Sequence, residues 1–366
     1  MGGRGRVLVL VPDLRLPGGV THYYATVDLD RHPSIDYFYV NSADPETALG
    51  TVMRLVARYG RFLWLLVFGG YRLVHVNPSL NARSFYRDGV FIGLARLLRR
   101  PVLITMHGWD EEFAREVAER SWLRGFFRAT FARVQGVIVL GKLFQERLQG
   151  LGVPQSTPFW IDTTVAEPPA NPAPPSPVEE ACVQVLFMSR VLESKGIFVA
   201  MEAVAMARSR LPDTRIVMVV AGDGPDLERA KDRARQLGLE DVLFTGYVRG
   251  PEKQRVLAQS DVLLFPTWYG EGLPCVVLEA MSHGLVVITR PVGGIPEVVQ
   301  PGEHGYLLES TRPEDFAEVL VRVIGDEALR QRIAEANRRA ARRFGKEAVE
   351  ARILEIHASL LGDPLT

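Results

Sequence analysis

Two glutamates stand eight residues apart in a segment that could bind both a sugar and a phosphate. Glu271 lies in a Gly-rich turn, and Glu279 lies in the apolar stretch that follows, which is typical of a helix. Backbone N–H groups at the N-terminus of that helix would stabilise an anionic phosphate. These groups belong to Gly272, Leu273 and Cys275. A carboxylate beside a phosphate is suited to hydrogen-bonding sugar hydroxyls; the alternative is two solvated acids on a helix face.

Two cations follow an earlier apolar run. Arg190 and Lys195 come directly after Val183–Met188, which reads as a strand. A guanidinium fork together with an ammonium group suits a diphosphate whose leaving group gains negative charge. The alternative is a pair of solvated loop cations.

Gly-rich turns follow two more predicted strands. They lie in Val219–Pro225 and Phe244–Val248, and either could be an ordinary tight turn between a strand and a helix. No segment matches the Gly-x-Gly-x-x-Gly dinucleotide fingerprint or a phosphate loop ending in Gly-Lys-Ser/Thr. These absences from the sequence argue against NAD-dependent and ATP-hydrolysing enzymes.

The first half offers a glycine turn and a histidine. Gly18 and Gly19 follow the run Val7–Val11 and would let backbone approach a ligand. His107 follows Val102–Thr105 and should project beyond the end of that strand, although a lone histidine is often structural. The spacing of Cys and His residues predicts no zinc site, and we expect no metal.

The elements that must position these residues alternate between short aliphatic runs and longer helical segments. This alternation predicts two Rossmann-like domains with parallel sheets, whose ligands bind beyond the carboxyl ends of the strands. The predicted strands are Val7–Val11, Tyr37–Val40, Leu73–Val76, Val102–Thr105 and Val137–Leu140 in the first half, and Val183–Met188, Arg215–Ala221, Val242–Thr245, Val262–Pro266 and Val286–Thr289 in the second.

A proline-rich stretch at 167–180 divides the 366 residues nearly in half. It predicts a semi-rigid linker between a first domain at 1–166 and a second at 181–345. Residues 1–166 carry 20 Lys and Arg against 14 Asp and Glu, and residues 167–366 carry 23 against 29. The neutral total therefore combines a positive net charge in the first part with a negative net charge in the second. Two cysteines and no long apolar run favour a cytoplasmic protein, and the neutral total argues against nucleic-acid binding.

Five segments of the second half resemble one known family in the same order. They are Arg190 with Lys195, Ala221–Pro225, Phe244–Val248, Glu271 with Glu279, and Gly293–Glu297. Together they resemble the GT-B-fold, retaining glycosyltransferases of glycosyltransferase family four. The first half resembles this family only through Gly18, Gly19 and His107, as expected if it holds the variable acceptor.

The resemblance implies two Rossmann-like domains facing each other across a cleft, with a C-terminal helix at about 346–366 crossing back to the first domain. It also implies a UDP- or GDP-sugar donor and no required cofactor, with Arg190 and Lys195 neutralising the diphosphate. In the implied roles, Glu279 binds the ribose, Glu271 binds the donor sugar, and Tyr247 and Val248 lie against the base. Backbone N–H groups come from Gly272, Leu273 and Cys275. From the first domain, the donor is met by His107, Gly18 and Gly19. Pro274 stands where members often have Gly, which removes one N–H donor.

The predicted activity is transfer of a sugar, with retention and without a metal, to a glycan or lipid-linked acceptor in cell-surface polysaccharide or glycolipid synthesis. A binding or membrane-scaffolding protein without turnover and a GT-B sugar-nucleotide epimerase are the alternatives. The segments Ser121–Arg133 and Arg54–Trp64 mix aromatic residues with arginines. Such segments either lie on an anionic membrane, here the inner face, or bury their aromatic residues in the core.

Overall fold

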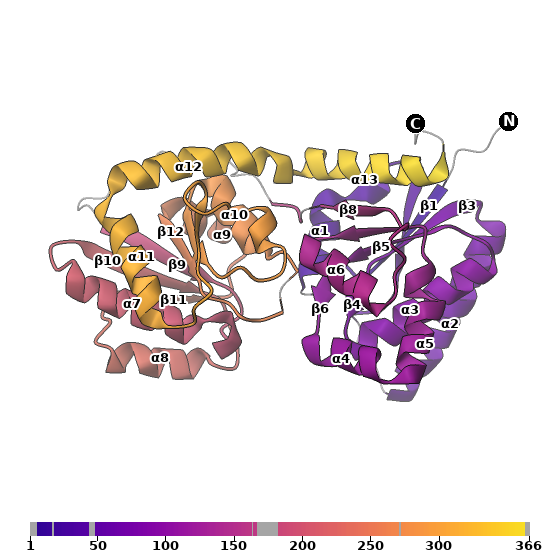
Figure 1. Ribbon diagram of the computed structural model, residues 1–366, viewed down its shortest axis with the longest axis horizontal. Coiled ribbons are helices and arrows are strands. Elements are labelled where there is room, and N and C mark those ends of the chain that lie inside the picture. Colours follow the sequence, from indigo (N-terminus) through magenta and orange to yellow (C-terminus); the bar gives the residue numbers. More distant parts are fainter. Residues whose placement is uncertain are drawn as a thin grey trace. The chain divides into compact units, whose positions relative to one another are not determined.

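The computed structural model describes residues 6–16, 18–43, 48–162, 164–166, 182–270 and 272–362. The chain forms two compact units (Figure 1). Unit 1 comprises Met1–Val165 and Lys346–Thr366, and unit 2 comprises Ala166–Gly345. The proline-rich segment 167–180 and Glu271 lie outside the described residues.

Unit 1 is built on a six-stranded parallel sheet in the order β2-β1-β3-β5-β7-β8. The strands are β1 (Arg6–Val11), β2 (Ile35–Tyr39), β3 (Tyr71–Val76), β5 (Val102–Met106), β7 (Gly136–Val139) and β8 (Phe159–Ile161). A two-stranded sheet pairs β4 (Ser79–Leu80) with β6 (Gly108–Trp109). Each run predicted as a strand in this half is one, whereas the three-residue β8 was too short to be predicted.

Helices cover both faces of this sheet. They are α1 (Gly19–Val27), α2 (Ala48–Phe68), α3 (Ala82–Leu97), α4 (Glu111–Glu119), α5 (Ser121–Ala129), α6 (Lys142–Leu151) and α13 (Lys346–Leu361). On one face, buried side chains of α1 and α13 form a core with Val7, Val9 and Leu73. On the other face, the rings of Phe38, Phe62 and Phe91 join β2, α2 and α3. Two apolar layers therefore hold the strands whose ends carry Gly18 and His107.

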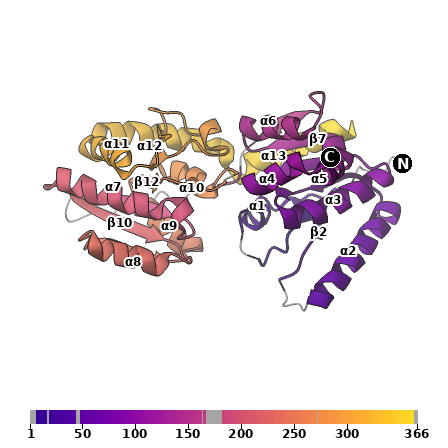
Figure 2. The same ribbon diagram turned by 60° about the horizontal axis from the view of Figure 1, so that its bottom comes forward.

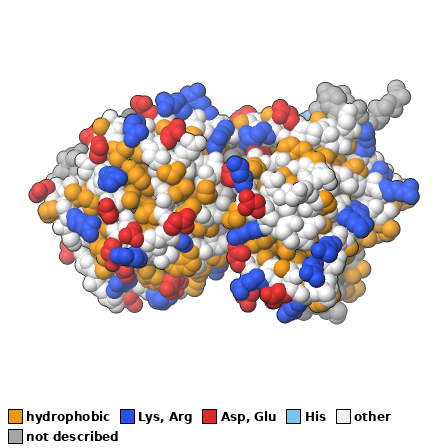
Figure 3. All heavy atoms as spheres, in the orientation of Figure 1, with side chains coloured by type: hydrophobic (Ala, Val, Ile, Leu, Met, Phe, Trp, Pro, Cys, Tyr) orange, Lys and Arg blue, Asp and Glu red, His pale blue; other side chains and the backbone are white. Residues whose placement is uncertain are grey.

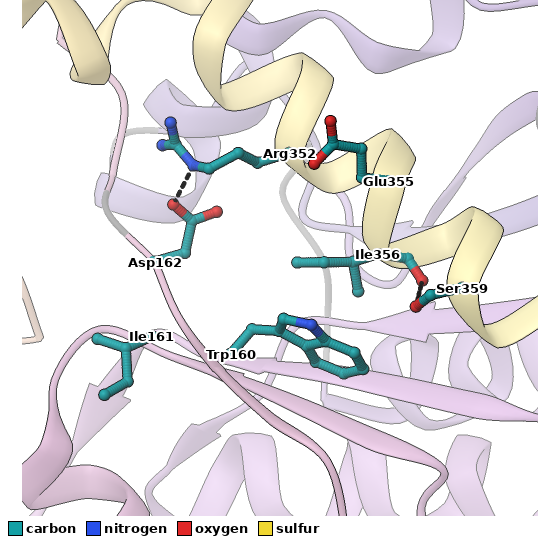
Figure 4. Close-up of a pocket in the computed structure, with 7 residues that line it drawn as sticks. All are labelled: Trp160, Ile161, Asp162, Arg352, Glu355, Ile356 and Ser359. Carbon is teal, nitrogen blue, oxygen red and sulfur yellow. Dashed lines mark hydrogen bonds and ion pairs between the residues drawn. The ribbon is translucent and has the colours of Figure 1, made fainter.

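The C-terminal helix α13 belongs to unit 1. Its residues Val349, Ile353 and Ile356 are buried in the core of that unit. Arg352 reaches from α13 to Asp162, which follows β8, with Nε 2.7 Å from Oδ1. Figure 4 shows this ion pair beside Trp160 and Ile356, at a small pocket of about 320 Å³. Apolar burial and this ion pair together fix the helix on the sheet.

Unit 2 repeats the parallel arrangement in the order β11-β10-β9-β12-β13-β14. Its strands are β9 (Cys182–Met188), β10 (Arg215–Ala221), β11 (Val242–Gly246), β12 (Val262–Phe265), β13 (Val286–Thr289) and β14 (Gly305–Leu307). Its helices are α7 (Ile197–Arg210), α8 (Leu227–Gln236), α9 (Gly250–Gln259), α10 (Cys275–His283), α11 (Pro313–Gly325) and α12 (Glu327–Ala341). The five predicted strands of this half are present, and the edge strand β14 is the addition.

The acidic balance of the second half is dispersed on the face that Figure 3 displays. There, acidic and basic side chains are interspersed over the helices of unit 2. No broad positive surface covers this face of unit 2.

Candidate functional site

The predicted phosphate residues of unit 2 follow the two strands at which the strand order reverses. The chain runs outward from β9 to β10 and β11, then returns to β12 on the other side of β9. In such sheets, ligands bind at this switch point, beyond the carboxyl ends of the strands. Arg190 and Lys195 follow β9, and Gly272 follows β12. The two loops that flank the switch point thus carry the predicted phosphate residues.

Ser194 ties these two loops together. Its carbonyl oxygen accepts hydrogen bonds from the backbone nitrogens of Trp268, at 2.9 Å, and Tyr269, at 3.0 Å. A Cβ added at Gly196 would lie only 2.4 Å from the carbonyl oxygen of Pro266, so the loops touch where Gly196 has no side chain. Ser194 was not predicted as a site residue, because its role depends on a contact between distant segments.

Lys195 lies against an aromatic ring of the second loop. Its Nζ is 4.1 Å from the centre of the Tyr269 ring, a distance that allows a cation–π interaction. Tyr269 was not predicted as a site residue either. Its position in the sequence, shortly after a predicted strand and two residues before Glu271, was a signal that could have found it. The ring limits where the ammonium group can go.

Arg190 is exposed, and two glycines position the backbone around it. A Cβ at Gly222 would lie 1.8 Å from the carbonyl oxygen of Ser189, and one at Gly224 would lie 2.2 Å from that of Val191. These glycines follow β10, so the turn between β10 and α8 packs directly on the chain that carries Arg190. These glycines therefore do more than form an ordinary tight turn. Because they have no side chains, the two loops can approach each other closely.

The helix α10 begins at Cys275, with Pro274 as its N-cap. Proline has no side-chain acceptor with which to cap a helix, so this end has to be satisfied by other groups. Gly272 is held on the preceding turn, where its carbonyl oxygen accepts a hydrogen bond from Gly294 at 2.6 Å. Leu273 is buried, and Cys275 is partly buried. The helix end points its partial positive charge toward the same switch point.

Glu279 is buried rather than solvated, and it forms an ion pair. Its Oε1 lies 2.9 Å from Nζ of Lys253, and the side chains are only 5% and 12% exposed. Lys253 belongs to α9, and no pattern in the sequence links this helix to α10. The alternative of Glu279 as an acid on a solvated helix face is wrong.

Tyr247 and Val248 follow β11 at the same edge of the sheet. Tyr247 is 70% exposed, whereas Val248 is buried. An exposed tyrosine ring beside a buried aliphatic side chain is an arrangement on which a planar base could stack.

In unit 1, His107 lies at the end of β5 and is held by a polar partner. Its Nε2 is 3.1 Å from Oδ1 of Asn77, and Asn77 in turn donates from Nδ2 to the carbonyl oxygen of Leu10. Because Oδ1 only accepts, the proton of His107 lies on Nε2 and Nδ1 is the acceptor of the ring. The hydroxyl of Tyr24 also donates to Oδ1, at 2.6 Å. Burial lowers the pKa of His107 to about 4, so the ring is neutral at pH 7.

Gly18 and Gly19 begin the helix that follows β1. Gly18 is the N-cap of α1 with φ at 154°, which favours glycine, and its carbonyl oxygen accepts from His22. Neither glycine would place a Cβ closer than 3.8 Å to a neighbour, so space is open around this turn. The turn and His107 follow neighbouring parts of one sheet edge in unit 1.

The two segments that mix aromatic residues with arginines differ from one another. In α5 and the turn after it, Phe127 and Phe131 are fully buried and face the core, whereas Trp122 is 58% exposed. In α2, by contrast, an outward stripe is exposed. It comprises Met53, Val56, Trp64, Val67 and Phe68, which are 52 to 71% exposed. No helix among the described residues is long and apolar enough to cross a membrane.

Comparison with known sequences identifies the second half. Residues 175–340 match the family model described as glycosyl transferases group 1. This part of the chain belongs to the group 1 glycosyl transferases. The match covers the loops of Arg190, Lys195 and Gly272, which the sheet of unit 2 brings to one edge.

Relatives with curated names support the assignment of this group 1 domain. The chain is 27% identical over 276 residues to a putative colanic acid biosynthesis glycosyltransferase, WcaL, of Salmonella typhimurium, covering 71% of the chain and 64% of the relative. It is 30% identical over 182 residues to a D-inositol 3-phosphate glycosyltransferase of Corynebacterium aurimucosum, covering 48% and 43%. The chain thus spans less than two thirds of the length of these relatives.

Solved structures share the fold over nearly the whole chain. Anabaena HepE, in a structure with UDP and glucose, matches with a TM-score of 0.73 at 17% identity, covering 97% of this chain and 100% of that one. The lipopolysaccharide outer core galactosyltransferase WaaB matches with a TM-score of 0.69 at 16% identity, covering 97% and 99%. Together with the two parallel sheets, these likenesses confirm the GT-B fold, to which the group 1 domain contributes the second half.

Proposed function

We propose that the protein is a retaining glycosyltransferase that uses a UDP- or GDP-sugar and a glycan or lipid-linked acceptor in cell-surface polysaccharide or glycolipid synthesis. The observation that supports the proposal is that the loops after β9 and β12 flank the switch point of unit 2 and carry Arg190, Lys195 and the segment leading to the N-terminus of α10. Three sources of positive charge at one sheet edge suit a diphosphate.

These groups would assist departure of the nucleotide diphosphate. The bond between the anomeric carbon and the diphosphate oxygen breaks, and the acceptor oxygen bonds to that carbon from the same face. The acceptor proton passes to an oxygen of the leaving phosphate. Arg190 and Lys195 supply the charge that stabilises this leaving group, so the proposed reaction requires no metal.

The remaining site residues complete the proposed donor site. Glu279, oriented by Lys253, would accept from the ribose hydroxyls, and Tyr247 with Val248 would hold the base. Glu271 would bind the sugar hydroxyls, and Gly272, Leu273 and Cys275 would present backbone N–H groups. From unit 1, Gly18, Gly19 and neutral His107 would contact the sugar, with His107 able to accept a hydroxyl proton in a hydrogen bond at Nδ1.

The exposed stripe of α2 supports docking of unit 1 on an anionic membrane at the cytoplasmic face. Figure 2 shows α2 at the outer edge of unit 1. Trp64 and Phe68 are 59% and 71% exposed, and Arg54 and Arg61 lie along the same helix. A helix with exposed aromatic side chains and nearby arginines suits the boundary between headgroups and acyl chains. Such docking would bring a lipid-linked acceptor to the enzyme.

A screen of UDP- and GDP-sugars by thermal shift, followed by NMR of the transfer product, tests this function. We expect one nucleotide-sugar to raise the melting temperature and the product to keep the anomeric configuration of the donor. An inverted product would contradict the retaining mechanism. Binding without release of nucleotide would instead favour a protein that binds the sugar nucleotide without turnover.

A further inference from the structure

Two side-chain bridges connect β3 and the residue after it to β5 and the residue after it, and in each bridge the partners are 30 residues apart. Nε2 of His75 lies 2.7 Å from Oγ1 of Thr105. Two residues further along each of the two segments, Oδ1 of Asn77 lies 3.1 Å from Nε2 of His107. Side chains two residues apart on a strand share a face of the sheet. Both bridges therefore lie on the same face, which α1 and α13 cover.

The second bridge lies where the backbone pairing of these strands is interrupted, whereas His75 of the first bridge is still paired with Leu103. β3 and β5 pair as far as Val76 with Ile104, and the ladder resumes at Ser79 with Gly108 in the short sheet of β4 and β6. Between these points the backbone nitrogen of His107 donates to the carbonyl oxygen of Pro78 at 3.1 Å. Side chains must therefore help to set the distance between the segments that follow β3 and β5, at the place where the His107 ring is held.

The C-terminal helix completes the first bridge. Nε2 of His357, in α13, lies 3.0 Å from Nδ1 of His75, and the two rings meet edge to face with centroids 5.1 Å apart. Both imidazoles are fully buried. A hydrogen-bonded series thus runs from the last helix of the chain through His75 to Thr105, two residues before His107.

Burial decides which group donates and which accepts in each hydrogen bond of this series. Desolvation lowers the pKa of His357 to about 3 and that of His75 well below its usual value, so both rings are neutral at pH 7. Nδ1 of His357 is buried and has no hydrogen-bond partner among the described residues. An N–H group is costlier to leave unpaired than a bare nitrogen, so the proton of His357 lies on Nε2. His357 then donates to His75, and His75 donates to Thr105.

We propose that His75 and His357 are positioning residues for His107. By fixing the distance between β3 and β5 at Thr105, these two histidines set the geometry of the second bridge, in which Asn77 orients the His107 ring. The last helix of the chain is then part of the site of unit 1 rather than only a cover for its core. This inference rests on the proposed function, since it gives the orientation of His107 a use.

The substitutions His357→Leu and His357→Gln test the inference. Leucine removes the donor, whereas the amide nitrogen of glutamine can reach the position of Nε2. With ¹⁵N-labelled histidine, we expect His357→Leu to shift the ring resonances of His107 and to lower kcat by about tenfold, with the KM for UDP-glucose or GDP-mannose unchanged. His357→Gln should restore both the resonances and kcat.

Arg352→Ala is the matched control, because it weakens docking of α13 through Asp162 without touching His357. It should lower the melting temperature and leave the His107 resonances and kcat unchanged. Unmoved His107 resonances in His357→Leu, or equal movement in Arg352→Ala, would overturn the inference. Thr105→Val breaks the same series from the other end and serves if His357→Leu does not fold. If His107→Ala keeps full turnover while His357→Leu still shifts the His107 resonances, the proposed role of His107 fails and the positioning stands.

Discussion

The Lys195 ammonium group lies 4.1 Å from the centre of the Tyr269 ring, and this contact joins the two loops that flank the switch point of unit 2. Ser194, the neighbour of Lys195, accepts backbone hydrogen bonds from Trp268 and Tyr269. The ring and the backbone bonds thus hold a flexible side chain against the loop that connects β12 to α10. A lysine restrained in this way needs less ordering when a diphosphate binds.

Replacing the ring should weaken this restraint without removing the charge. A cation–π contact at an exposed site contributes about 0.5–1 kcal/mol, so Tyr269→Leu should raise the KM for the nucleotide-sugar by roughly two- to fivefold. Tyr269→Phe keeps the ring and should behave like the wild type. Steady-state kinetics of both variants would measure this, and equal effects of the two substitutions would mean that the ring face is unimportant.

The close approach at Gly222 predicts a strong effect of one methyl group. Gly222→Ala would place Cβ 1.8 Å from the carbonyl oxygen of Ser189, so the chain that carries Arg190 must move. We expect a lower melting temperature and weaker binding of UDP or GDP in calorimetry. Gly325→Ala is the control in the same unit, because its Cβ would meet nothing within 4 Å. A Gly222→Ala protein that binds nucleotide normally would contradict the role given to this turn.

Two desolvated histidines of unit 1 predict that acid destabilises the protein. The folded-state pKa values of His107 and His357 are about 4 and about 3, below the value of about 6.5 in an unfolded chain. Between these values the unfolded chain binds more protons, so the free energy of unfolding falls as pH decreases from 6.5 toward 4 by up to about 1.4 kcal/mol per pH unit for each histidine. Urea unfolding at several pH values should show a shallower dependence for His357→Gln than for the wild type. Parallel curves would contradict this assignment.

The outward stripe of α2 predicts binding to anionic vesicles. Wild-type protein should float with phosphatidylglycerol liposomes at low salt and less well at high salt, because screening weakens the contribution of arginines. Trp64→Glu should abolish flotation, whereas Trp122→Glu, in the helix whose Phe127 faces the core, should retain most of it. Wild-type protein that stays unbound at low salt would exclude the membrane proposal.

Much of the fold was predictable because strand and helix periods differ in sequence. The ten predicted strands exist, and the residues singled out after them lie at the carboxyl edges of the two sheets, since parallel strands end on one side. The edge strands Phe159–Ile161 and Gly305–Leu307 were missed because three residues show no usable period.

Contacts between distant segments could not be predicted. The Lys253–Glu279 pair depends on how α9 packs beside α10, and the His75–His357 contact depends on where the last helix returns. A burial pattern can indicate that such side chains turn inward, but a single sequence does not say which partner they meet. In α5, the arginines suggested a surface helix, and the burial of Phe127 shows that one face of this helix packs against the core, whereas Trp122 is exposed.

Release of nucleotide by Lys195→Ala, compared with wild type, tests the central claim most directly. Wild-type protein should release UDP or GDP from one nucleotide-sugar, and faster with an acceptor. Lys195→Ala should lower kcat by about 10²–10³-fold, the loss typical of removing one group that stabilises developing charge, while circular dichroism and melting temperature stay close to wild type. Unchanged release in the variant, or no release by the wild type from any UDP- or GDP-sugar, would contradict the assignment of the site.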